Sequence, residues 1–150
     1  MRIGLWSLIS LVGLLALAAQ DGADKAPTKR FGIEPDSKTY PQAAPKETLA
    51  SLLKAVDAKR VDYVLAQLAD PDWVDRRVKE LDGGFTALLE ESASRLTGDP
   101  GAVKRLKKLS VDGEWKIDAD TAVLLLKDME ESALFFRKSD GRWFVENRKK

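Results

Sequence analysis

The fold is decided by residues 121–147, which read TAVLLLKDMEESALFFRKSDGRWFVEN. Two runs of β-forming residues, TAVLLLK and SALFFRK, lead to the pair Asp140-Gly141 and then to a third run, RWFVEN. An Asp-Gly pair between β-forming runs is a strong signal for a hairpin turn. A further short run, EWKI at residues 114–117, comes just before. The pattern therefore predicts an antiparallel meander of about four strands.

The two central strands of this predicted sheet lack the alternation of a strand with one wet face. Residues 122–126 are five apolar residues in a row, and residues 134–136 are three. Such runs are typical of strands that are covered on both faces. Helices can cover one face of the sheet. The other face is therefore predicted to be covered by a partner subunit or a docked segment of this chain, or to form the wall of a concave pocket.

The apolar period changes from 2 to 3.6 upstream of the sheet. Residues 46–69 carry apolar residues at i, i+3, i+4 and i+7 twice, which predicts two helices in tandem with Pro45 in the first turn and Pro71 after the second. Shorter helices are predicted at 72–81, 85–96 and 102–109. Helices that precede an antiparallel sheet indicate the α+β class, with the helices packed on one face of a curved sheet.

The first eighteen residues are predicted to be a secretory signal peptide. Arg2 precedes an apolar run from Ile3 to Ala19, and Ala16-Leu17-Ala18 matches the small-x-small pattern of a cleavage site. The protein is therefore expected to be secreted into the periplasm or the extracellular space. The alternative, a membrane anchor formed by residues 3–19, stays open, and contact with a membrane is expected only in that case.

The rest of the chain divides into two predicted parts. Residues 19–45 contain four prolines and no regular apolar period, which predicts a flexible arm that Phe31, Ile33 and Tyr40 could pin loosely to the domain. Residues 46–150 are predicted to form a single α+β domain.

Composition excludes several classes of function. Arg2 is the one basic residue of the predicted signal peptide. The mature chain would therefore have 24 of the 25 basic residues and all 24 acidic residues, and its formal net charge would be zero. An exported chain of balanced charge has no electrostatic basis for binding nucleic acid. The chain has no histidine and no cysteine. This excludes serine–histidine and cysteine–histidine nucleophiles and histidine-based zinc or haem sites, and we predict neither a cofactor nor a metal.

Three segments resemble the nuclear-transport-factor-2-like superfamily, which includes polyketide-cyclase-like and ketosteroid-isomerase-like proteins. They are ETLASLLKAVDAKRVDYVLAQLADP, DADTAVLLL and DGRWFVEN, and the likeness covers roughly residues 46–148. The chain is also similar to small exported bacterial proteins in which a YPQ segment, here residues 40–42, precedes the first helix. The resemblance implies a cone-shaped, cystatin-like α+β roll. It implies no activity, because function depends on the site and not on the fold.

The leading hypothesis is an exported, non-enzymatic binding or interaction module. It would hold a small apolar ligand inside the cone, or a partner protein or second copy on the sheet. The predicted pocket-lining residues are Trp115, Leu125, Phe136 and Trp143, with Phe135 and Phe144 on the opposite face.

Two other functions stay open. The first is a carboxylate-dependent isomerase, cyclase or hydratase, which needs an acidic side chain with a raised pKa in an apolar pocket. No catalytic residue is predicted, because Tyr63 is the only tyrosine of the predicted domain, and Asp118 and Asp120 occupy a turn. The second is a purely structural or assembly protein.

Overall fold

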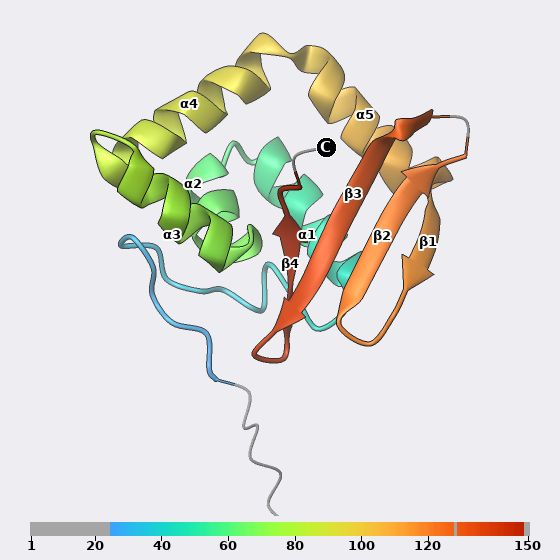
Figure 1. Ribbon diagram of the computed structural model, residues 1–150, viewed down its shortest axis with the longest axis horizontal. Helices are drawn as coiled ribbons and strands as arrows, with labels where there is room; N and C mark the ends of the chain where they lie inside the picture. Colours follow the sequence, from blue (N-terminus) through green and yellow to red (C-terminus); the bar gives the residue numbers. More distant parts are fainter. Residues whose placement is uncertain (1–24, 128, 149–150) are drawn as a thin grey trace, which may run out of the picture.

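The computed structural model describes residues 25–127 and 129–148, and it confirms the predicted α+β class. Within these residues, five α-helices and one π-helical turn pack with a four-stranded antiparallel sheet. In Figure 1, α1 and α5 lie behind the sheet, whereas α3 and α4 lie beyond its β4 edge. The predicted signal peptide, residues 1–18, lies outside the described residues.

The sheet is the predicted meander, with strand order β1-β2-β3-β4. The strands are β1 (Glu114–Ile117), β2 (Thr121–Leu126), β3 (Met129–Ser139) and β4 (Arg142–Glu146). Asp140 and Gly141, between β3 and β4, have positive φ angles of 48° and 72°, as a type I′ hairpin turn requires. Strand β3 begins earlier than predicted, because a register shift after Leu125 lets Leu126 pair with Met129.

The helices follow the predicted order, and prolines stand in the first turn of three of them. Their bounds are α1 (Pro45–Asp57), α2 (Val61–Tyr63), the π-helical turn η1 (Val64–Leu68), α3 (Pro71–Glu80), α4 (Gly84–Gly98) and α5 (Pro100–Asp112). Pro71 thus starts α3 as well as following the preceding helix. The N-cap of α3, Asp70, accepts a hydrogen bond from the backbone N–H of Asp72.

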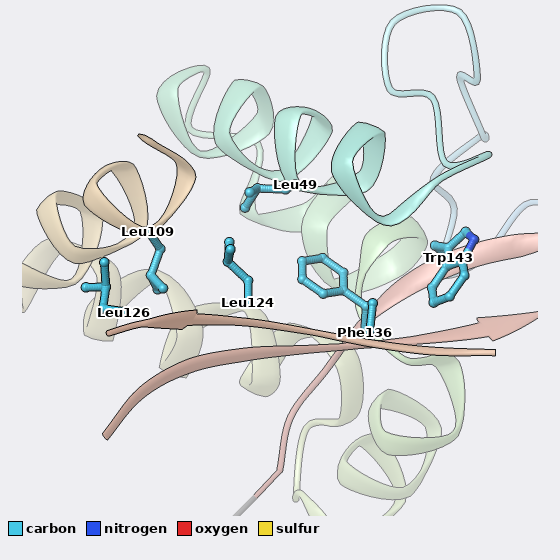
Figure 2. Packing of buried hydrophobic residues seen from close by; sticks show 7 residues of the cluster. Leu49, Leu109, Leu124, Leu126, Phe136 and Trp143 are labelled. Carbon is cyan, nitrogen blue, oxygen red and sulfur yellow. The ribbon is translucent and has the colours of Figure 1, made fainter. Parts of the chain in front are cut away.

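The core lies between one face of the sheet and the helices α1 and α5. Figure 2 shows Leu49 of α1 and Leu109 of α5 pointing toward Leu124 and Leu126 of β2. Phe136 and Trp143 extend this layer along β3 and β4. We call this the inner face of the sheet.

A close approach at Gly113 holds α5 against the sheet. A Cβ atom at this position would lie 2.4 Å from both the Leu109 carbonyl oxygen and the Leu124 Cδ1 atom. Any other residue would therefore push the end of α5 away from β2.

The opposite, outer face of the sheet is apolar but only half covered. Val123 and Leu125 alternate with the buried residues of β2, and Phe135 pairs directly with Val123. All three are half-exposed, and the Arg148 guanidinium lies 4.6 Å from the centre of the Phe135 ring. The sequence predicted cover on both faces, whereas in the described structure the helices bury one face and leave these outer side chains partly open.

Residues 25–44 are packed against the domain, unlike the flexible arm predicted for residues 19–45. Tyr40 and Gln42 are buried. The Gln42 Nε2 atom donates to the carbonyl oxygens of Gln67 and Trp143 at 3.0 and 2.8 Å, and the Trp143 N–H donates to the Gln42 carbonyl at 2.9 Å. The folded unit therefore starts before the predicted boundary at residue 46.

Candidate binding sites at the two ends of β4

The predicted pocket residues do not come together as one group. Trp115, Phe136 and Trp143 belong to the inner-face core, where the rings of Trp115 and Phe136 have centroids 5.2 Å apart. Leu125 lies on the outer face, because it pairs with Glu114 and alternates with the buried Leu124.

The three predicted residues that meet are largely enclosed by protein side chains. Phe136 is 0% exposed and Trp143 is 5% exposed. Trp115 is half-buried and borders a small hollow of about 190 Å³ beside α1. Phe135 and Phe144 do lie on the outer face, as their pairing positions show. The inner face of this sheet is therefore mainly a packed core.

A larger groove, which we call the β3 groove, lies between β3, the end of β4 and the π-helical turn. Its volume is about 440 Å³. It is lined by Leu52, Val64, Leu65, Ala69, Trp73, Ala133, Leu134, Phe135, Val145, Glu146, Asn147 and Arg148. Nine of these twelve side chains are apolar, so the groove suits an apolar occupant.

One wall of this groove is a strand edge without a neighbour. Strand β4 pairs with β3 only from Phe135 to Ser139, whereas β2 pairs with β3 as far as Met129. Ala133 and Leu134 therefore have a β-partner on one side, in β2, and, among the described residues, none on the other. Backbone N–H and C=O groups on such an edge form a template for a further strand.

The opposite wall is formed where η1 turns into α3. The Ala69 N–H donates to the Val64 carbonyl at 2.7 Å, which is the i to i+5 bond of a π-helix. The Asp70 N–H then donates to the Val145 carbonyl at 2.8 Å and ties this junction to β4. Single π-turns inside helices often occur at functional sites.

An ion-pair network holds the same junction in place. Arg137 Nη2 lies 2.6 Å from Asp70 Oδ1 and 2.7 Å from Asp72 Oδ2. Among the side chains whose burial the structure describes, which leaves out residues 128–131, Asp70 is the only buried carboxylate, and it faces Arg137 as well as capping α3. It is therefore a structural group and not a free acid in a pocket.

Three other carboxylates have pKa values that are shifted in the direction opposite to that of a general acid. Hydrogen bonds from Thr39, Arg60 and Arg105 lower the pKa values of Asp36, Asp62 and Asp99, respectively. A general acid of the isomerase type needs the opposite shift. Within residues 25–127 and 129–148, no group of three or more acidic side chains could hold a metal ion.

A second cavity, which we call the arm cleft, lies at the start of β4. Its volume is about 270 Å³, and its lining comes from the packed arm, α2 and the β3–β4 turn. Sequence reasoning missed both cavities. Pro41 and Gln42 of the YPQ segment line the arm cleft, whereas nothing local in the sequence signals the β3 groove.

In comparisons with protein-family models, with curated proteins and with solved structures, nothing matched this chain. The resemblance to nuclear-transport-factor-2-like proteins therefore stays a prediction. In the part of the chain that the structure describes, no helix has the length and apolar character to cross a membrane.

Proposed function

We propose that this protein is a binding module that takes an extended segment of a partner polypeptide into the β3 groove. The observation that carries the proposal is the edge of β3 at Ala133 and Leu134, which on the side away from β2 has no β-partner among the described residues and borders an apolar groove. This is a refinement of the predicted interaction module.

An extended polypeptide can both hydrogen-bond to the strand edge and fill the apolar groove. Its backbone can hydrogen-bond to the open edge of β3, as in other cases of strand addition. Alternate side chains of the added strand would point toward the apolar lining around Leu65 and Trp73 and toward the outer face of the sheet. A small apolar ligand could fill the groove, but it would leave the strand edge without hydrogen-bond partners.

The charges at the groove are already paired with each other. Arg148 Nε lies 2.8 Å from Glu146 Oε2, and the same guanidinium lies over Phe135. An occupant therefore gains little from a net charge, and apolar side chains should dominate its affinity. Trp73 is the strongest candidate anchor, since half-buried aromatic side chains dominate many interfaces.

Site-specific photo-cross-linking tests the proposal. A photoreactive phenylalanine analogue replaces Trp73 in one variant and Val111 in a control, because Val111 is 82% exposed and lies in α5, outside the groove. Both variants are expressed in cells that naturally make the protein. We expect a polypeptide adduct at position 73 that exceeds any adduct at position 111. A synthetic peptide of the cross-linked segment should then slow hydrogen exchange at residues 133–134.

Three results would contradict the proposal. A peptide that binds without protecting residues 133–134 would exclude strand addition. An adduct of low mass at position 73 would favour a small apolar ligand instead. A dimer in native mass spectrometry that disappears when Trp73 is replaced by alanine would assign the groove to self-association.

A further inference from the structure

The arm cleft has a polar end within an otherwise apolar lining. It is lined by Pro27, Pro35, Ser37, Pro41, Gln42, Ala43, Tyr63, Gly141 and Arg142. Three proline rings provide rigid apolar walls, while Arg142 and Tyr63 provide hydrogen-bond donors. The cleft lies at the opposite end of β4 from the β3 groove and shares no lining residue with it, so binding in the cleft is independent of the proposed function.

Arg142 is a half-buried cation without an ion pair among the described residues. Its one hydrogen bond to a side chain runs from Nη1 to Gln42 Oε1 at 3.4 Å, and the buried Nε atom has no acceptor. The guanidinium lies 4.9 Å from the centre of the Phe144 ring. Burial lowers the pKa of Arg142, since desolvation disfavours the charged form.

Arg137 shows how the same fold treats a comparable side chain. Its guanidinium is also half-buried, and it bonds to the carboxylates of both Asp70 and Asp72. A guanidinium withdrawn from water normally requires such partners, because burying an unpaired charge is costly. Arg142 therefore has unused capacity to bind an anion.

Tyr63 adds a second donor to the cleft. Its side chain is only 3% exposed, and its hydroxyl oxygen accepts a hydrogen bond from the Asp36 N–H at 2.9 Å. A phenolic hydroxyl can also donate one bond. No described group accepts that bond, so the hydroxyl hydrogen is available to an occupant of the cleft.

Three further charged groups lie near this polar end, and none of them forms an ion pair with Arg142. Asp140 lies close enough to favour the charged form of Arg142, but it forms no ion pair with it. Asp36 lies near Tyr63, and its carboxylate accepts a hydrogen bond from the Thr39 N–H. Arg30 is a second cation near Arg142, and it is paired with Asp75.

We propose that the arm cleft binds a carboxylate group carried on a compact apolar body. The Arg142 guanidinium and the Tyr63 hydroxyl donate to the carboxylate oxygens, and the proline rings contact the apolar body. A planar guanidinium suits this ligand, because it can form two parallel bonds to a carboxylate. The volume of about 270 Å³ lies near the lower end of small-molecule sites, so the ligand must be small.

The test compares two probes of the same shape, benzoate and its neutral amide, benzamide. Calorimetric titration of the purified protein should show benzoate binding at least about tenfold more tightly, because hydrogen bonds to charged groups contribute that much or more. Arg142→Met should abolish the preference, and Tyr63→Phe should weaken benzoate binding several-fold. Arg148→Met is the matched control at the other end of β4 and should leave benzoate binding unchanged.

Equal affinity for the two probes, or no binding of either at millimolar concentrations, would overturn the proposal. This comparison uses the unsubstituted protein, so it stays decisive even if a variant fails to fold. Two further probes identify the source of the carboxylate. Tighter binding of acetyl-alanyl-proline than of benzoate, lost in the peptide amide, would indicate the free end of a polypeptide. The reverse order would indicate a small organic acid.

Discussion

Replacing Gln42 by alanine tests whether the arm is part of the folded unit. Gln42 is 7% exposed, and its Nε2 atom bonds to the carbonyl oxygens of Gln67 in η1 and Trp143 in β4. The side chain therefore connects three segments that are distant in the sequence. Gln42→Ala removes both bonds, and also the long bond that Gln42 Oε1 accepts from Arg142, while it leaves the backbone bond from Trp143 to residue 42 in place.

The cost depends on the hydrogen bonds that the two carbonyl groups keep. The Trp143 oxygen keeps a bond from Thr48 Oγ1 at 3.2 Å, so it loses only one of two donors. The backbone carbonyl oxygen of Gln67 loses the bond from Gln42 Nε2, which is the side-chain donor that it has in the described structure. One weakened and one orphaned acceptor together cost about 2–4 kcal/mol of unfolding free energy. The melting temperature should fall on the order of 10 °C.

Denaturant unfolding measures this loss, with two further variants for comparison. Gln42→Glu keeps an oxygen acceptor beside Arg142 but has no N–H group, so it should also lose the bonds to the carbonyl oxygens of Gln67 and Trp143. Lys38→Ala is the control, since this arm residue is exposed. If Gln42→Ala stays within about 0.5 kcal/mol of the Lys38→Ala variant, as surface substitutions do, the arm is not held by these bonds. The arm cleft would then have no fixed wall.

Two further predictions concern the register of the sheet and the response to acid. Phe136→Ala should lower the free energy of unfolding by about 3–5 kcal/mol, as for other large buried side chains. Phe135→Ala, on the half-exposed outer face, should cost less than half of that. Equal losses for the two variants in denaturant unfolding would contradict the register. Arg60 holds the pKa of Asp62 below its usual value, so this carboxylate stabilises the fold above its unfolded pKa and loses that effect as the pH falls through its folded pKa. Asp62→Asn should therefore flatten the decline of stability between about pH 5 and pH 2, and an unchanged pH profile would argue against the Arg60 contact.

The class of the fold and the order of its elements can be predicted from the sequence, because the signals involved are local. Asp140-Gly141 adopts the positive φ angles of a tight hairpin turn, and EWKI at residues 114–117 forms β1 as predicted. Pro45 stands in the first turn of α1 for the same local reason, since its missing N–H is not needed there. Turn chemistry and apolar period act over a few residues, so one chain is enough to interpret them.

Which side chains meet depends instead on tertiary packing. Five successive apolar residues at 122–126 carry no alternation, so the sequence could not tell that Leu124 faces the helices while Leu125 faces outward. The docking of the arm depends on Gln42 and Trp143, which are 101 residues apart. Both cavities form in the same way, where segments distant in the sequence pack around the two ends of β4. Strand register and packing between distant segments are collective properties, and local periodicity does not encode them.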